Sequence, residues 1–287
     1  RGVAALGVPR AGAADPFGLR AANRLVGNED GAAAIEVNGA GPSLRAGCHA
    51  HVAVVGSADV SVDGRPVTPD AVVPVAPGQS LAVGTVRHGL RCYVALDGGL
   101  DVPTVLGSRS SDVLSGLGVG PLRPGDALGL GAPRRPRGRL AWPGTRGGPR
   151  RLRVMAGPDP FPPGALELLT DVSWTVGSES DRMGVRLHGP HRLGTPGPVT
   201  SRAMVTGAVQ VPPDGQPVVL GCDHATVGGY PVVATVVLAD HGVLGRCAPG
   251  DTVAFSVVDG PGAERARGAA TRALAQAVTG WYPTRAD

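Results

Sequence analysis

Apolar residues recur at helical spacing in two parts of the chain. Near the N-terminus, Asp15 can cap a helix, Pro16 suits its first position and Gly27 can end it, which predicts a helix over 15–27. Its apolar stripe consists of Phe17, Ala21, Ala22 and Leu25. A second helix closes the chain and should end at Gly280. Its apolar positions are Ala266, Ala269, Ala270, Ala273, Leu274, Ala277 and Val278.

Short apolar or alternating runs between turn residues predict β-strands over much of the remaining chain. The clearest runs are Val52–Val55, Val60–Val62, Val72–Val75, Leu81–Val86 and Cys92–Leu96. Three Pro-Gly pairs, at 77–78, 124–125 and 249–250, each precede such a run and predict type II turns. The segment 63–67 (DGRPV) also resembles 214–218 (DGQPV). This recurrence predicts a mainly β protein with a few helices, built as two related β-rich halves.

The distribution of charge indicates where the two halves meet. Seven of the 27 basic residues lie between 132 and 151, a stretch rich in proline and glycine that contains no acid. We therefore expect an N-terminal half over 1–131, an Arg/Pro/Gly-rich linker over 132–151 and a C-terminal half over 152–287. Outside the linker the chain contains 20 basic and 23 acidic residues, so it has no excess of positive charge there and a nucleic-acid partner is not expected.

The composition excludes several kinds of chemistry. Every basic side chain other than histidine is arginine, so neither a lysine Schiff base nor a lysine-containing phosphate loop can form. No apolar run is long enough to span a membrane and no signal peptide is seen, so we expect a cytoplasmic protein without a membrane partner. Four widely separated cysteines predict reduced, buried thiols. His49 and His51 would share one face of a strand, but their alternation is typical of a half-exposed strand, and no metal site is expected.

Three polar clusters stand out in the C-terminal half. The first places the carboxylate of Asp181 beside the guanidinium of Arg182. The second places Gln210 and Gln216 around a proline-rich turn, an arrangement suited to recognising a small amide. The third consists of Gly228, Gly229 and Tyr230, where backbone N–H groups lie beside a phenol and could hold an anion. Each cluster is also compatible with an ordinary loop or hairpin, and no self-contained catalytic signature accompanies them.

The order of these segments resembles the family of the 5-oxoprolinase C subunit, also called KipA, allophanate hydrolase subunit 2 or the biotin-dependent carboxyltransferase family. The opening GVPRAGAAD at 7–15 and ANRLVGN at 22–28 begin the resemblance. It continues through GLRCY at 89–93, GSRS at 107–110, DRMG at 181–184, Gly207–Pro217 and GGYP at 228–231. Relatives carry a glutamine where Ala225 stands and often a basic residue where Val232 stands. These departures affect the expected activity more than the expected fold.

The resemblance implies a cyclophilin-like β-barrel that works with the KipI-like B subunit and the A subunit of 5-oxoprolinase. Together these proteins hydrolyse 5-oxo-L-proline to L-glutamate at the expense of ATP, which the partner subunits would bind or share. The chain alone is not expected to be active. One alternative is the carboxyltransferase part of a biotin-dependent urea carboxylase and allophanate hydrolase system. Another is a non-catalytic partner that antagonises a KipI-type kinase inhibitor.

Together with the polar clusters, this interpretation gives expected roles to nine residues. Asp181 and Arg182 would orient the substrate and Gln210 would recognise its amide, so these three are the expected catalytic residues. The expected substrate-binding residues are Asp15, Asn23, Gln216, Gly228, Gly229 and Tyr230. Asp15 is also the predicted helix cap, so its replacement tests stability as well as chemistry.

Overall fold

A computed structural model describes residues 2–140 and 149–281, which fold into two compact β-rich units. The barrel unit consists of Arg1–Ala14, Val105–Gly120 and Gly148–Ala270, and the sheet unit of Asp15–Thr104, Pro121–Gly147 and Thr271–Asp287. The chain thus passes between the units several times, whereas the sequence predicts two consecutive halves. The predicted linker 132–151 contains strand β7 (Arg137–Leu140) and the start of β8 (Arg150–Ala156), and its residues 141–148 lie outside the described part.

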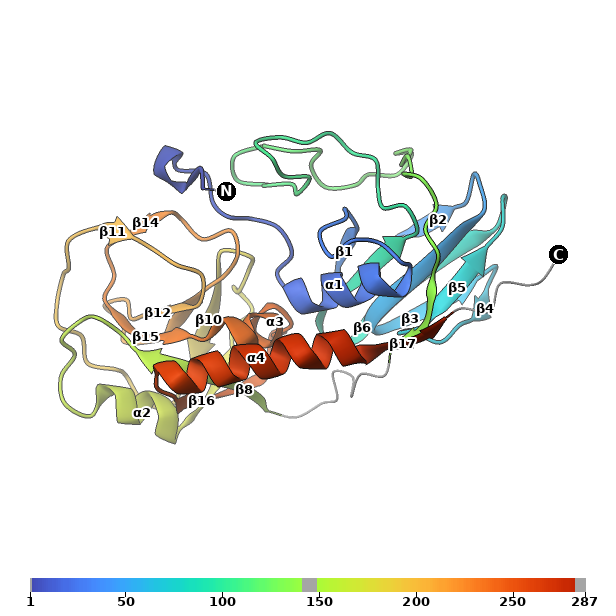
Figure 1. The fold of residues 1–287 in the computed structure, drawn as a ribbon. Helices are drawn as coiled ribbons and strands as arrows, with labels where there is room; N and C mark the ends of the chain where they lie inside the picture. The colour runs from blue at the N-terminus through green and yellow to red at the C-terminus, as the bar shows by residue number, and fades with distance from the viewer. Residues whose placement is uncertain (1, 141–148, 282–287) are drawn as a thin grey trace. The chain divides into compact units, whose positions relative to one another are not determined.

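The barrel unit is a closed β-barrel whose strands follow the order β10-β13-β12-β15-β8-β16-β9 (Figure 1). All of its strand pairs are antiparallel except β8 with β16. The remaining barrel strands are β9 (Ser173–Val176), β10 (Gly184–His188), β12 (Ala208–Gln210), β13 (Val218–Leu220), β15 (Val232–Val236) and β16 (Thr252–Val257). Its core is built from alternate strand residues around the fully buried Trp174, whose indole N–H donates to the carbonyl of Leu169 over 2.9 Å.

Short elements surround the barrel. Strands β11 (Arg202–Ala203) and β14 (Val227–Gly228) pair with each other in a two-stranded ribbon. The helices of this unit are η1 (Ala4–Leu6), α2 (Ala165–Asp171), η2 (Leu238–Asp240), α3 (His241–Gly245) and most of α4 (Gly260–Ala277). Within the described parts of the chain, none of the helices has both the length and the apolarity that crossing a bilayer requires.

The sheet unit is organised around two long antiparallel strands, β3 (Ala50–Val62) and β6 (Ser80–Leu96). The other strands of this sheet are β1 (Ile35–Asn38), β2 (Ser43–Arg45), β4 (Arg65–Pro66) and β5 (Val72–Val75). Helix α1 (Pro16–Leu25) packs on β3 and β6 with its apolar side, and a separate two-stranded pair joins β7 to β17 (Val278–Trp281). The predicted mainly β architecture is therefore confirmed, with the barrel in one unit and an open sheet in the other.

Local sequence signals predicted the caps and turns well. The Asp15 carboxylate accepts hydrogen bonds from the N–H groups of Phe17 and Gly18, as an N-cap does. At the Pro-Gly pairs 77–78, 124–125 and 249–250 the glycine has a positive φ (86°, 95° and 85°). The backbone N–H of the residue after each glycine donates a hydrogen bond to the carbonyl of the residue before the proline. These are the predicted type II turns.

Two element boundaries differ from the prediction. Val52–Val55 and Val60–Val62 lie in one strand, because register shifts between Val55 and Val60 absorb the interruption without ending the pairing with β6. The last helix ends at Ala277 instead of continuing through Val278, which pairs with Leu140 in the two-stranded β7–β17 sheet. Of the four thiols, Cys92, Cys222 and Cys247 are buried as predicted, whereas Cys48 is exposed.

Candidate functional site

Arg182 lies against Asp223, which is 41 residues away in sequence, and not against its neighbour Asp181. Its Nε and Nη2 donate to the two carboxylate oxygens of Asp223 over 2.6 and 3.0 Å, and Nη2 also donates to the carbonyl of Gly12 over 2.6 Å. The Asp223 carboxylate is only 7% exposed, so this is a nearly buried, forked ion pair. The predicted Asp181–Arg182 pair is therefore wrong.

Asp181 has a local role at the start of β10. Its carboxylate accepts hydrogen bonds from the N–H groups of Met183 over 2.8 Å and Gly184 over 3.0 Å. Asp181 therefore bonds within its own turn, while Arg182 bonds to Asp223. Asp181 thus shapes the segment that carries Arg182.

The opening segment of the chain is held at the same place. The N–H of Ala11 donates to the carbonyl of Cys222 over 3.1 Å, and Gly12 accepts the bond from Arg182. Ala11 has φ +48°, a left-handed conformation that is unfavourable for a residue with a Cβ. Three segments that are far apart in sequence, around residues 10, 182 and 222, therefore meet at one point of the barrel unit.

His241 is a further member of this region that the sequence did not single out. Its Nε2 lies 3.3 Å from the carbonyl of Val236, and a Cβ added at Gly207 would lie 2.9 Å from that nitrogen. Burial lowers the pKa of His241 below its usual value, and the nearby charge of Arg10 lowers it further. The Val236 carbonyl and Asp240 act in the opposite direction, but the net pKa is lowered. A single histidine without a motif gives no sequence signal for such a position.

Gln210 is placed by an irregularity in β12. The pairing of β12 with β15 shifts register between Val209 and Gln210, and both residues are buried. The Gln210 amide nitrogen lies 3.3 Å from the sulfur of Met204 and 3.5 Å from the carbonyl of Tyr230. A Cβ at Gly228 would come within 2.9 Å of the same nitrogen, which explains why glycine stands there. The structure thus places Gln210 beside Gly228 and the backbone of Tyr230, and the recognition roles expected for them stay predictions.

An ion pair anchors the β11–β14 ribbon beside these residues. Arg202 of β11 donates to Asp159 over 2.8 and 2.5 Å, and the same carboxylate accepts the N–H of Val232 over 2.6 Å. The Arg202 hydrogen bonds hold the pKa of Asp159 below its usual value. This contact links the ribbon to the start of β15 and so fixes the segment that carries Tyr230.

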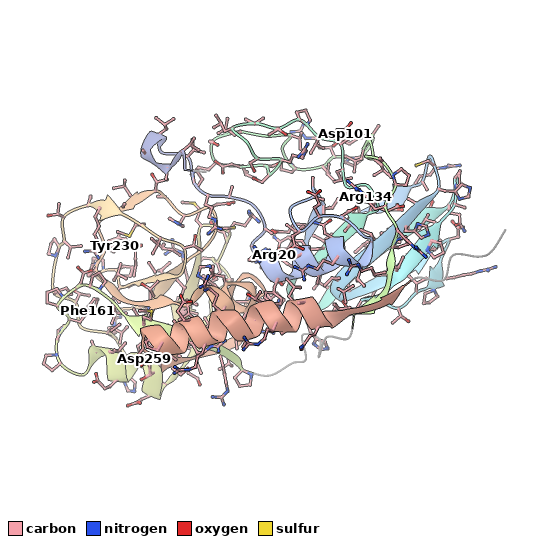
Figure 2. All side chains as sticks on the ribbon, in the orientation of Figure 1. Arg20, Asp101, Arg134, Phe161, Tyr230 and Asp259 are labelled. Atoms are coloured by element: carbon pink, nitrogen blue, oxygen red, sulfur yellow. The ribbon has the colours of Figure 1, made fainter. Side chains whose placement is uncertain are left out.

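A cavity of about 160 Å³ lies beside Tyr230 and contains two of the predicted binding residues. Its polar side chains are Glu179, Arg186, His188, Asp214, Gln216 and Tyr230. Gln216 is held rigidly, because its Oε1 accepts the N–H of Gly189 over 2.8 Å and its Nε2 donates to the carbonyl of His191 over 3.0 Å. Figure 2 shows Tyr230 on the barrel unit, and this residue is 49% exposed.

The comparison with known families is decisive for the class of protein. Residues 6–257 match the family described as "Carboxyltransferase domain, subdomain A and B". The chain belongs to this carboxyltransferase-domain family.

One curated protein and two solved structures illustrate what this member of the family is similar to. The 5-oxoprolinase C subunit of Escherichia coli is 33% identical over 262 residues, covering 87% of this chain and 83% of that protein. The crystal structure of TTHA0988 aligns with a TM-score of 0.80 and 37% identity, covering 88% of this chain and 51% of that one. The Kluyveromyces lactis urea amidolyase structure aligns with a TM-score of 0.85 and 27% identity, covering 100% of this chain and 19% of that one. The chain thus spans about half or less of these two solved proteins.

Two residues predicted for the site of this carboxyltransferase domain belong to the sheet unit. Asp15 is 2% exposed, and its carboxylate is used by the first turn of α1. Asn23 is fully buried; its amide nitrogen donates to the carbonyl of Ala32 over 2.9 Å, and its oxygen accepts from Asn28 over 3.2 Å. Both side chains stabilise the α1 region. Among the described residues, no group of three or more His, Cys, Asp or Glu side chains is placed to hold a metal ion.

Proposed function

We propose that this carboxyltransferase-domain protein is the C subunit of a 5-oxoprolinase. The observation that carries the proposal is the correspondence with the E. coli protein, which extends over most of both chains. In the urea amidolyase the same domain is a small part of a much longer chain. The Haemophilus influenzae C subunit is also 33% identical, over 90% of this chain and 85% of that protein, which supports the same assignment. This protein would hydrolyse 5-oxo-L-proline to L-glutamate together with the A and B subunits.

The cavity beside Tyr230 supports binding of a small cyclic amide that carries a carboxylate. The phenol of Tyr230 and the guanidinium of Arg186 have no hydrogen-bond partner among the described residues, so both can donate to a ligand. We propose that Arg186 binds the substrate carboxylate. Tyr230 and the remaining amide hydrogen of the rigid Gln216 would then donate to the lactam carbonyl.

The proposal places ATP on the partner subunits or between them and this chain. The absence of lysine, which rules out a lysine-containing phosphate loop here, supports this division. Hydrolysis would then need the complex, and the isolated chain would be inactive.

The test is coexpression with the cognate A and B subunits, followed by measurement of glutamate released from 5-oxo-L-proline with and without ATP. We expect ATP-dependent release that falls at least about tenfold in Arg186→Gln and Tyr230→Phe. The matched control is Arg151→Gln, which removes an exposed arginine of β8 outside the cavity. Equal activity of all three variants would show that the cavity is not the substrate site.

A second candidate function is the carboxyl-transfer half of a biotin-dependent urea carboxylase. The alignment of this entire chain with the K. lactis urea amidolyase structure favours it. It predicts that a biotinylated carrier stimulates urea-dependent turnover while 5-oxo-L-proline is not hydrolysed. A tight complex with a KipI-like protein and no turnover of either substrate would instead support the non-catalytic regulatory function.

A further inference from the structure

The outer face of strand β10 carries two polar side chains that border the cavity beside Tyr230. Successive residues of a strand point to opposite faces. In β10, Val185 and Leu187 belong to the buried core of the barrel. Arg186 and His188 share the opposite face, where both are exposed and line the cavity. The proposed substrate contacts use Arg186 and leave His188 without a role.

The imidazole of His188 is paired with a carboxylate. Its Nε2 lies 2.6 Å from Oε1 of Glu179, which also lines the cavity. Two hydrogen bonds tie the loop that carries Glu179 to β10. The N–H of Gly177 donates to the carbonyl of Arg186 over 2.8 Å, and the N–H of Arg186 donates to the Ser180 hydroxyl over 3.0 Å. A Cβ at Gly177 would lie only 2.6 Å from each of the two paired atoms, so glycine leaves room for the pair.

This pairing determines which nitrogen of His188 can accept a hydrogen bond. A hydrogen bond from its own backbone N–H, together with His188 and the charge of Arg186, lowers the pKa of Glu179 against the opposing effect of desolvation. Glu179 is therefore ionised at neutral pH, and its oxygens can only accept. Nε2 of His188 consequently carries a proton, which leaves a lone pair on Nδ1 of the neutral ring. Among the described residues Nδ1 has no hydrogen-bond partner, so it is available to a ligand.

We propose that Nδ1 of His188 accepts the ring N–H of the lactam substrate and so determines specificity for a secondary amide. The inference rests on the proposed function for the identity of the substrate. In 5-oxo-L-proline the N–H lies between the carbon that bears the carboxylate and the lactam carbonyl. Arg186, the proposed partner of the carboxylate, precedes His188 by two residues on the same face. Gln216, the proposed partner of the carbonyl, is held at the next residue, Gly189. The protein groups thus follow the same order as the groups of the ligand.

Asp214 supplies another carboxylate to the cavity lining and is the competing acceptor. Its Oδ1 accepts the N–H of Gln216 over 3.0 Å, and its backbone carbonyl accepts from Arg192 over 3.1 Å. A second carboxylate oxygen in contact with the N–H would repel the substrate carboxylate beside it, whereas the neutral ring of His188 would not. Asp214→Asn keeps an oxygen for the Gln216 N–H and replaces the other oxygen with a donor. It is therefore the matched control.

The experiment measures by calorimetry the affinity of the whole chain for 5-oxo-L-proline and for 5-oxotetrahydrofuran-2-carboxylate. The second ligand keeps the carboxylate and the carbonyl but has a ring oxygen in place of the N–H. We expect the wild type to prefer the lactam at least about tenfold, because the ring oxygen would face the lone pair of Nδ1 without a hydrogen bond. His188→Phe should bind both ligands equally, with its affinity for the lactone changed less than about twofold.

Further variants separate the acceptor from the shape of the ring. His188→Asn, which retains an acceptor near the position of Nδ1, should keep part of the preference, and Asp214→Asn should keep all of it. Gly177→Ala should lose most of it, because the added Cβ separates His188 from Glu179. Melting temperatures within about 3 °C of the wild type establish that the variants are folded.

Each outcome decides the inference. A preference that survives in His188→Phe overturns it, and so does a preference that is lost in Asp214→Asn. Equal affinity of the wild type for the two ligands, or no binding of 5-oxo-L-proline, also overturns it. Loss of the preference in His188→Phe, with no turnover by the wild-type complex with the A and B subunits, supports the specificity residue and refutes the proposed function. ATP-dependent turnover with an unchanged preference in His188→Phe does the reverse.

Discussion

Replacing Arg182 with alanine tests whether its ion pair anchors the opening segment to the barrel unit. The change removes two hydrogen bonds to Asp223 and one to the carbonyl of Gly12. It also leaves the carboxylate of Asp223, 7% exposed, without its cation. Ala11 would then lose a neighbour that helps to hold its left-handed conformation.

The magnitude follows from burial and geometry. Breaking a buried pair from one side costs about 3–5 kcal/mol, because the remaining charge stays desolvated. The Arg182 side chain is 25% exposed, so water reaches the site and the lower end of that range, about 3 kcal/mol, applies. For a domain of about 150–250 residues this corresponds to a fall in Tm of about 6–12 °C.

The assay is urea unfolding of wild type, Arg182→Ala, Asp223→Asn and the double variant. In the double-mutant cycle, the combined loss should be smaller than the sum of the single losses by about 1–3 kcal/mol. Arg87→Ala is the control, because its partner Asp59 lies on an exposed surface and the pair should contribute little. An unchanged unfolding midpoint for Arg182→Ala, or a coupling energy of zero, would refute the anchoring role.

Three further predictions concern the Asp15 cap, the buried His241 imidazole and the cysteine thiols. Asp15→Ala should lose about 1–2 kcal/mol in urea unfolding and Asp15→Asn much less, because asparagine can still cap α1. His241→Gln should reduce the loss of stability between pH 7.5 and 5.5. The lowered pKa of His241 means that the unfolded chain takes up the proton first as the pH falls through about 6.5. In thiol titration with Ellman's reagent, exposed Cys48 should react rapidly and Cys92 slowly, since burial raises the pKa of the Cys92 thiol to about 12.

Elements whose causes lie within a few residues were predictable from sequence. The cap at Asp15 and the Pro-Gly turns depend on local hydrogen bonds and on glycine's freedom to adopt a positive φ. The strands of the sheet unit follow from alternating apolar residues. The resemblance of ordered motifs also identified the family, which no isolated cluster could do.

Features that depend on distant partners were not predictable in the same way. Asp181 is next to Arg182 in sequence, yet Arg182 bonds to Asp223, 41 residues away, while Asp181 accepts backbone N–H groups of its own turn. Val278 continues a helical apolar pattern but lies in β17 opposite Leu140. Pairing with a distant strand can place a residue in a β-strand although its local sequence has helical periodicity. The periodicity of one segment does not reveal such a partner.

The predicted site residues form two groups, which differ in whether their polar side-chain groups already have hydrogen-bond partners within the protein. Asp15, Asn23 and Arg182 bond to groups of their own unit, so they stabilise the fold before any ligand arrives. Tyr230 differs because it is half exposed, borders the cavity and has a hydroxyl without a partner among the described residues. Loss of Arg182 should therefore lower stability and turnover together. Loss of the Tyr230 hydroxyl should lower turnover alone, and only such a separation would assign that hydroxyl to the chemistry.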